Sequence, residues 1–212
     1  MRNIPFFDTQ NGVASLVLKE IPYTQSAYIT ILDTQDLTAL LAECVDFCRV
    51  VGAEHIYAKG HAELCRYPEY MQVLQMEAST EHWLQTDAVL VPVGDESLKV
   101  WCSIYNQKMS GVDNASYMSA FDGENMRKRG DGYFVELDGN QISIVMAAEG
   151  KLSALASVAP GGGRVALLAL KKTFGWNCVS LEVASTNHKA INLYKSMGFA
   201  EKGLVSAWYK IL

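Results

Sequence analysis

The chain has 212 residues, of which 50% are apolar and 19% are charged, and this composition excludes a disordered protein. Lys and Arg number 18 against 23 Asp and Glu, so the formal net charge of −5 predicts no nucleic-acid partner and no basic membrane-binding surface. The acidic excess lies in residues 1–86, which carry 5 basic and 11 acidic side chains against 13 and 12 in residues 87–212. Five scattered cysteines and the lack of a long apolar run lead us to expect a cytoplasmic protein.

The first half alternates short apolar runs with one strong helical pattern. Runs at 13–18, 28–32 and 55–58 predict strands. Between them, apolar residues at helical spacing predict a helix over 37–51, which Gly52 ends. The stretch that follows is rich in Glu, Tyr and Met and has no clear period.

The second half predicts a complete α+β plan. In chain order we expect strand 87–93, helices 96–108 and 115–127, strands 133–137, 142–147 and 151–159, helix 164–174, strand 179–184, helix 187–197 and strand 205–212. Asp138-Gly139 is a strong hairpin signal between the second and third strands. The pattern therefore favours a mixed, largely antiparallel sheet flanked by helices, with domains over 1–86 and 87–212.

The two halves share one short pattern. Ala-Leu-Leu-Ala occurs at 39–42 and again at 166–169, each time within a helix that leads through glycine to a strand. One hypothesis is that the N-terminal half is a degenerate copy of the C-terminal one. The alternative is coincidence, because this tetrapeptide is common in helices.

The most specific motif lies near the C-terminus. It reads Asn187-x-x-Ala190-x-x-Leu193-Tyr194, followed by Gly198-Phe199 and preceded by Leu-Glu-Val at 181–183. This block closely resembles the last signature block of the GCN5-related N-acetyltransferases (GNAT), and its lead-in looks most like the branch that acetylates protein N-termini. The resemblance implies the GNAT fold for the C-terminal domain, with an N-terminal α/β half added.

The resemblance also implies catalytic roles for two residues. Acetyl transfer to an amine needs a base for the ammonium and an acid for the departing thiolate. By resemblance, Tyr194 is the general acid at the coenzyme A sulfur, and Glu182, twelve residues earlier, is the base that acts through water. The alternatives are a packing role for Tyr194 and simple solvent exposure for Glu182.

The expected cofactor turn joins strand 151–159 to helix 164–174. Backbone amides at a helix start can hold a pyrophosphate, so we expect acetyl-CoA to contact this turn and the start of the last helix. The expected contacts are Val158, Ala159, Gly161, Gly162, Gly163, Arg164, Val165, Ala166, Asn187, Ala190 and Tyr194. The turn departs from the family pattern, because it is short and Arg164 stands where a glycine is usual. Asn187 also fits an N-cap.

Two other kinds of site fit parts of the sequence. Gly161-x-Gly163-x-x-Ala166, with Glu182 twenty-one residues after Gly161, matches a dinucleotide fingerprint, although too few βα units follow it. A zinc site would need cysteines such as Cys44 and Cys48, which core packing explains more simply. We expect no metal.

We therefore expect an N-acetyltransferase that transfers the acetyl group of acetyl-CoA directly to a primary amine on a small molecule or peptide. The alternative is a non-catalytic acyl-CoA-binding or partner-binding pseudoenzyme of the same fold. The expected assembly is a monomer or a homodimer, without nucleic acid or membrane.

Overall fold

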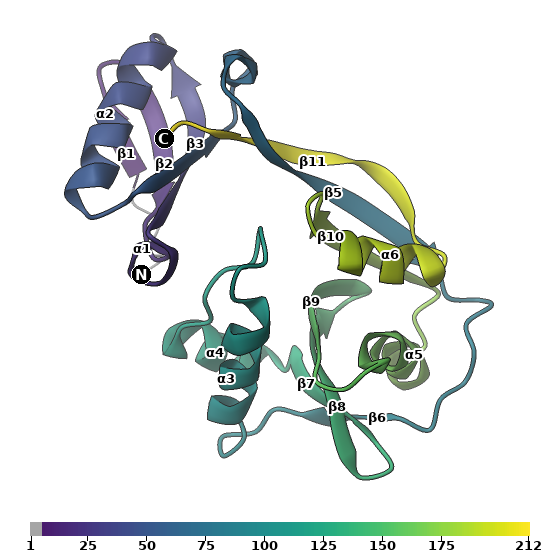
Figure 1. Ribbon diagram of the computed structural model, residues 1–212. Helices are drawn as coiled ribbons and strands as arrows, with labels where there is room; N and C mark the ends of the chain where they lie inside the picture. The colour runs from purple at the N-terminus through teal and green to yellow at the C-terminus, as the bar shows by residue number, and fades with distance from the viewer. Residues whose placement is uncertain (1–5) are drawn as a thin grey trace. The chain divides into compact units, whose positions relative to one another are not determined.

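Residues 6–212, which the computed structural model describes, form two units (Figure 1). Unit 1 contains the described residues up to Gln72 and Ser206–Leu212, and unit 2 contains Val73–Val205. The chain passes between them within strands β5 (Glu69–Ser79) and β11 (Ala200–Lys210). The units are therefore divided after residues 72 and 205, whereas the sequence suggested a single division after residue 86.

Unit 1 is a sheet with one long helix on it. Its strand order is β1-β2-β3-β4-β11, and only β3 and β4 are parallel neighbours. Its other elements are β1 (Phe6–Thr9), β2 (Gly12–Val17), α1 (Ile21–Thr24), β3 (Ser26–Thr34), α2 (Leu37–Val50), β4 (His55–Lys59) and the 3-10 helix η1 (Ala62–Arg66).

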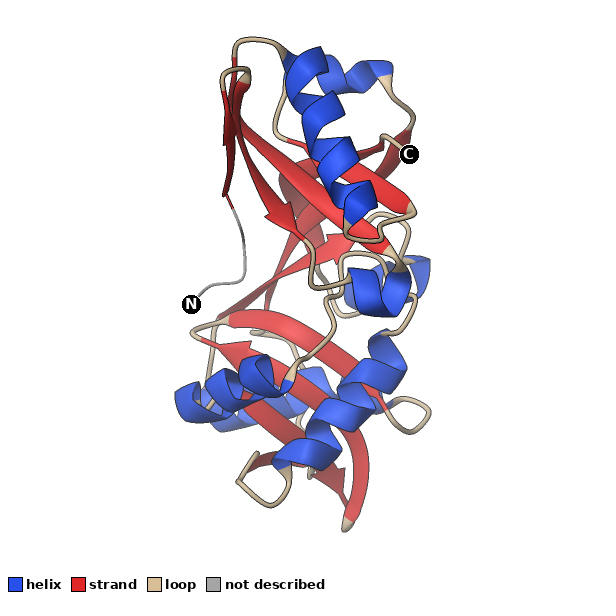
Figure 2. Cartoon of the chain, turned by 90° about the vertical axis from the view of Figure 1, so that its left-hand side faces the viewer, coloured by secondary structure: helices blue, strands red, loops and turns tan. Residues whose placement is uncertain are grey.

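Helix α2 covers one face of that sheet (Figure 2). Asp36 starts the helix, because its carboxylate accepts the Ala39 amide at 3.0 Å. Cys44 and Cys48 lie on the buried side of α2, where burial raises the pKa of Cys44 to about 12 and that of Cys48 to about 11. These thiols are core side chains, and residues 6–212 contain no group of three His, Cys, Asp or Glu that could hold a metal ion.

Unit 2 has the strand order β11-β5-β10-β9-β8-β7-β6. Its elements, besides β5 and β11, are β6 (Val89–Pro92), α3 (Leu98–Met109), α4 (Ala120–Arg129), β7 (Gly132–Leu137), β8 (Asn140–Ala148), β9 (Lys151–Ser157), α5 (Gly162–Phe174), β10 (Cys178–Ala184) and α6 (His188–Ser196). All neighbouring strands with a described register are antiparallel except β9 and β10. This sheet contradicts the dinucleotide alternative, because that fold needs successive parallel βα units.

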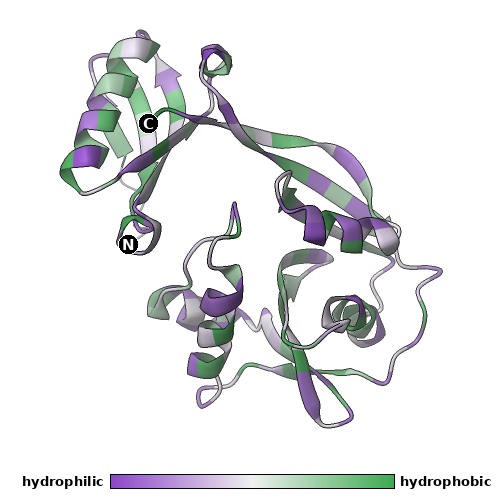
Figure 3. Cartoon of the chain, viewed as in Figure 1, coloured by the Kyte–Doolittle hydropathy of each residue, from purple (hydrophilic) through white to green (hydrophobic). Residues whose placement is uncertain are grey.

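Helices lie on both faces of the unit 2 sheet. Helix α5, which Figure 3 colours largely as apolar, packs with α6 in one core, and α3 and α4 pack in another with β7, β8 and β9. The α+β fold with a mixed, largely antiparallel sheet is as the sequence predicted. None of the helices within residues 6–212 has the length and apolarity needed to span a membrane.

Several elements differ from the prediction: β1, α1 and η1 were not expected, and β11 begins at residue 200 and not at 205. Strand β5 was missed, because its buried residues alternate as Met71 and Val73 but resume out of step at Met76 and Ala78. Helix α4 begins at residue 120, not at 115. Ser119 starts it by accepting the Asp122 amide at 3.1 Å, which leaves residues 110–119 as a loop.

The topology supports the repeat hypothesis. Apart from the one-turn helix α1 between β2 and β3, the order β1-β2-β3-α2-β4-η1-β5 matches β7-β8-β9-α5-β10-α6-β11, with the same antiparallel and parallel pairings up to the fourth strand. The fourth strand of each series pairs with the last strand of the other series: β10 pairs with β5, and β4 pairs with β11.

Residues 80–88, near the start of unit 2, contact the C-terminal ends of α5 and α6. The Trp83 indole Nε1 donates to the Met197 carbonyl at 2.9 Å, and its ring contacts Phe199 with centroids 5.9 Å apart. Lys172 Nζ donates to the Ala88 carbonyl at 3.2 Å. This segment is therefore part of the core of unit 2.

This packing predicts graded losses of stability at Trp83. Trp83→Phe keeps an aromatic ring and should lower the free energy of unfolding by about 1 kcal/mol, the typical value of one hydrogen bond. Trp83→Ala also removes the ring and should cost about 3 kcal/mol. Denaturant unfolding measures both, and equal losses in the two variants would contradict the assigned ring contact.

Candidate functional site

The site begins where two parallel strands separate. Strands β9 and β10 share only two registered pairs, Lys151 with Ser180 and Leu152 with Leu181. On the other edge of β9, Ala147 pairs with Leu152 but the adjacent Met146 pairs with Ala154. Ser153 is therefore an extra residue, and this bulge coincides with the point where the parallel ladder stops.

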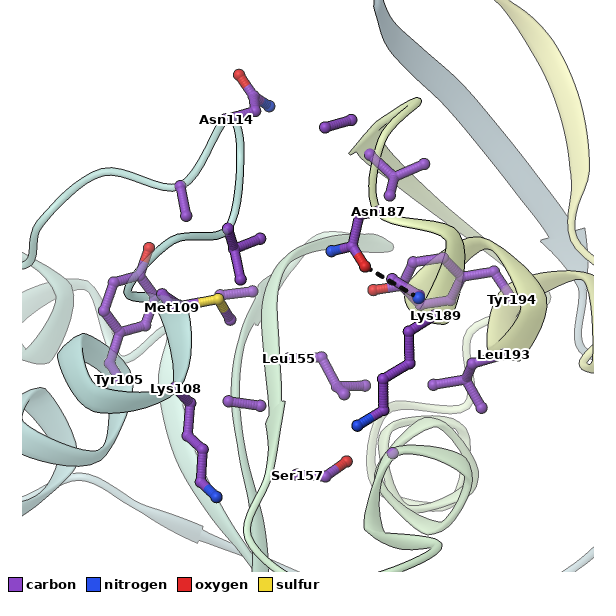
Figure 4. A pocket seen from close by; sticks show the side chains of 18 of the residues that line it. Tyr105, Lys108, Met109, Asn114, Leu155, Ser157, Asn187, Lys189, Leu193 and Tyr194 are labelled. Carbon is purple, nitrogen blue, oxygen red and sulfur yellow. Dashed lines mark hydrogen bonds between the residues drawn. The ribbon is translucent and has the colours of Figure 1, made fainter. Parts of the chain in front are cut away.

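A cavity of about 460 Å³ lies beyond the bulge. One wall is β9 from Ser153 to Ser157, and the facing wall is the end of β10 with α6. Helix α3 and the loop after it form the third side, and the first residues of α5 close one end (Figure 4). The cavity lies wholly within unit 2.

Glycines allow α5 to start directly beside this cavity. Gly161 has φ of 78°, in the left-handed region that favours glycine. A Cβ on Gly162 would lie 2.3 Å from the Ile142 carbonyl oxygen, and one on Gly163 would lie 2.8 Å from Leu193 Cδ2. Close packing of α5 against β8 therefore requires glycine at residue 162, whereas a side chain at residue 163 would have to displace the side chain of Leu193.

The start of α5 also offers a backbone donor. The amides of Gly162 and Arg164 bond to carbonyls of the turn, at 3.1 Å each. Within residues 6–212 the amide of Gly163, a residue that lines the cavity, donates to no backbone carbonyl. With the helix dipole, this amide favours an anion at this end of the cavity.

Tyr194 extends from α6 into the cavity, and its hydroxyl points toward the space between α6 and α3 (Figure 4). The residue is 8% exposed, and burial raises its pKa to about 12. No other residue of the described chain forms a hydrogen bond with this hydroxyl. Its phenol is therefore protonated at neutral pH and can donate a hydrogen bond or a proton.

Asn187 acts as the predicted N-cap of α6 and also lines the cavity. Its side-chain oxygen accepts the Ala190 amide at 3.1 Å, the bond drawn in Figure 4. The cap sets the residue at which α6 begins, and it therefore sets the position along the cavity at which the Tyr194 side chain enters.

Glu182 does not reach the cavity. Strand alternation puts Leu181 and Val183 in the core and turns Glu182 to the other face, where its carboxylate accepts from Lys151 Nζ at 2.6 Å. The pair is exposed, so it adds little stability. The predicted catalytic pair is therefore not brought together.

The predicted cofactor residues also divide into two groups. The cavity is lined by Gly161, Gly163, Arg164, Asn187, Ala190 and Tyr194. It is not lined by Val158, Ala159, Gly162, Val165 and Ala166. In the second group, Gly162 and Ala166 are buried against the sheet because they lie on the inner side of α5.

Sequence reasoning missed most of the α3 side of the cavity. Tyr105, Met109 and Val112 line it with apolar surface and Lys108 adds charge, while Lys189 adds charge from α6 on the facing wall. In this part of the sequence the only signal is a pair of aromatic residues, Trp101 and Tyr105, with no motif around them. Of these, Trp101 is fully buried with its indole donating to the Tyr133 carbonyl, whereas Tyr105 reaches the cavity.

The corresponding place in unit 1 is closed. Strands β3 and β4 share five registered parallel pairs, from Ser26–His55 to Thr30–Lys59. The next residue, Gly60, packs so closely that a Cβ would lie 2.4 Å from the Ile31 carbonyl oxygen. The start of α2 is already capped by the carboxylate of Asp36. This copy therefore lacks both the strand separation and the free helix end.

Comparison with solved structures identifies the fold. A GCN5-related N-acetyltransferase from Sphaerobacter thermophilus is 11% identical, with 93% of this chain and 75% of that chain covered and a TM-score of 0.59. One from Kribbella flavida is 13% identical, with coverage of 99% and 89% and a TM-score of 0.54. A tandem GNAT protein from the clavulanic acid biosynthesis pathway is 12% identical, with coverage of 94% and 78% and a TM-score of 0.53.

The chain therefore has the GNAT fold, as the C-terminal motif implied. These identities are low, and neither protein-family models nor curated protein sequences match this chain. The fold supports acyl transfer in general, and the chemistry of this chain has to be argued from its own site.

The glycine packing at α5 can be tested separately from function. Gly162→Ala should lower the free energy of unfolding by about 2 kcal/mol, because its Cβ would overlap a backbone oxygen that cannot move aside. Gly203→Ala is the matched control, since a Cβ there meets nothing within 4 Å. Denaturant unfolding should show a change below about 0.5 kcal/mol for the control. A stable Gly162→Ala protein would contradict the observed packing.

Proposed function

We propose that unit 2 is an acetyl-CoA-dependent N-acetyltransferase that transfers the acetyl group directly to a primary amine. The observation that carries this proposal is the separation of β9 from β10 at Ser153, which opens a cavity between a free helix start and the buried hydroxyl of Tyr194. The same fold in the compared acetyltransferases is consistent with it.

The lining residues fit the parts of acetyl-CoA. Lys108, Arg164 and Lys189 bring positive charge to the cavity, and the ammonium groups of Lys108 and Lys189 point toward the end where Ser157 lies (Figure 4). The Gly163 amide adds a donor at the start of α5. The phosphates would lie at this end, and the thioester arm would extend along β9 toward Tyr194.

The reaction needs no covalent intermediate on the protein. The nitrogen of the neutral amine forms a bond with the thioester carbonyl carbon, and the carbon–sulfur bond breaks. Tyr194 supplies a proton to the departing thiolate, and the proton lost by the amine returns through water to the phenolate. Most of the rate gain would come from holding the two reactants in line.

Removing the hydroxyl of Tyr194 tests this role. Tyr194→Phe should lower kcat about 100-fold, the lower range for loss of a general acid, while the acetyl-CoA Kd changes little. Glu182→Gln is the control, because that side chain lies outside the cavity and should leave kcat unchanged. A thermal-shift assay with acetyl-CoA, coenzyme A and NADH should come first, because it measures which of these ligands the protein binds.

Each outcome has a clear meaning. Acetyl-CoA binding without thiol release across a panel of amines would identify a pseudoenzyme. No acetyl-CoA binding, or preferential binding of NADH, would contradict the proposed function. A large loss of kcat in Glu182→Gln would instead identify Glu182 as the catalytic base, as the family resemblance implies.

The pH dependence follows from the raised pKa of Tyr194. A group with a pKa of about 12 stays protonated below that pH, so loss of its proton should not lower the rate between pH 6 and 10. Over this range kcat/KM for an alkylamine should only rise, because the reactive neutral amine becomes more abundant toward its pKa of about 10. A falling limb below pH 10 would contradict the assigned role of Tyr194.

A further inference from the structure

The two ends of the cavity differ in chemistry. At one end are the cationic side chains of Lys108, Arg164 and Lys189. The other end is formed by the loop over residues 110–119, where Asn114 lies in Figure 4, and by the apolar side chains of Tyr105 and Met109. The Tyr194 hydroxyl points into the space between these ends. The loop end is therefore the side from which an acceptor would meet the thioester.

Asp113 is the only carboxylate among the described residues that line the cavity. Thr186, at the end of β10, donates from its hydroxyl to the Asp113 carboxylate at 2.6 Å. This bond joins the loop after α3 to the loop before α6. The carboxylate is thus held by the loop that forms this end of the cavity.

The loop that carries Asp113 is fixed at a second point. Asn106 on α3 donates to the Met118 carbonyl at 3.0 Å and accepts the Met118 amide at 2.8 Å. Within the loop, Gly111 and Asn114 both have positive φ, at 75° and 64°, in the left-handed region that glycine and asparagine tolerate. Asp113 is therefore placed before any acceptor arrives, which lowers the cost of binding.

We infer that the acceptor is a small amine with one ammonium group on an apolar body, and that Asp113 receives this ammonium, which then releases one proton to solvent water to give the neutral amine that attacks the thioester. This inference rests on the proposed function. One carboxylate matches one positive charge, and Tyr105, Met109 and Val112 supply an apolar wall for the rest of the molecule. A polyamine would have to bring its further ammonium groups toward Lys108, Arg164 and Lys189, and like charges in a confined site repel.

Three amines separate the possibilities in a thiol-release assay with acetyl-CoA at pH 7.5. The probes are 2-phenylethylamine with one ammonium, spermidine with three, and aniline, which is uncharged at this pH. In the natural sequence, kcat/KM should be at least about tenfold higher for 2-phenylethylamine than for spermidine, equivalent to 1.4 kcal/mol. Asp113→Asn should raise KM for 2-phenylethylamine about tenfold, since one charge contact in a partly buried site has this order of strength.

The controls separate charge recognition from loop structure. In Asp113→Asn, KM for acetyl-CoA and kcat/KM for aniline should stay unchanged. Asp138→Asn makes the same substitution in the β7–β8 turn, outside the cavity, and should leave all three amines unaffected. Thr186→Ser keeps the hydroxyl and should behave like the natural sequence, whereas Thr186→Val should raise KM for 2-phenylethylamine.

The outcomes distinguish this inference from the function on which it rests. If acetyl-CoA does not bind in a thermal-shift assay, the proposed function fails first. If acetyl-CoA binds, then a preference for spermidine, no transfer to 2-phenylethylamine, or the same fold-change for aniline in Asp113→Asn overturns the inference. In the last case Asp113 would serve only to hold the loop.

Discussion

The arrangement of unit 2 depends on one extra residue in one strand. Ser153 ends the parallel ladder between β9 and β10 after two pairs, and beyond it the strands cannot satisfy each other's backbone groups. Those edges become the walls of a cavity. Because α5 and α6 follow directly from the ends of these two strands, the same separation brings a helix start and the hydroxyl of Tyr194 to a common space.

A comparison with unit 1 shows what the bulge contributes. Unit 1 repeats the order of strands and helices, but β3 and β4 stay paired to the last residue of β4, and Gly60 then packs against Ile31. The carboxylate of Asp36 occupies the start of α2, where an anion would otherwise bind. The counterpart of α6 is reduced to the five residues of η1. A shared topology is therefore not sufficient to form a cavity. The cavity forms where β9 and β10 stop pairing.

Sequence reasoning worked where local chemistry decides the structure. The cap at Asn187, the helix that carries Tyr194 and the hairpin at Asp138 all follow from short patterns. It did not place Glu182, which lies outside the cavity lining, because twelve residues of spacing do not say which face of a strand a side chain takes. It also missed β5, whose buried alternation slips between Val73 and Met76 as the strand passes from one unit to the other.

The short turn before α5 has a physical explanation in the packing around it. Gly162 is needed for the close approach of the helix to β8, Gly163 packs against the side chain of Leu193, and the Arg164 amide is already bonded within the turn. Few backbone donors are thus left for an anion. The charges of Arg164, Lys108 and Lys189 at the same end offset that loss, because charged donors form the stronger hydrogen bonds to phosphate. An arginine where a glycine is usual is therefore consistent with anion binding at this end, with side-chain charge replacing backbone amides.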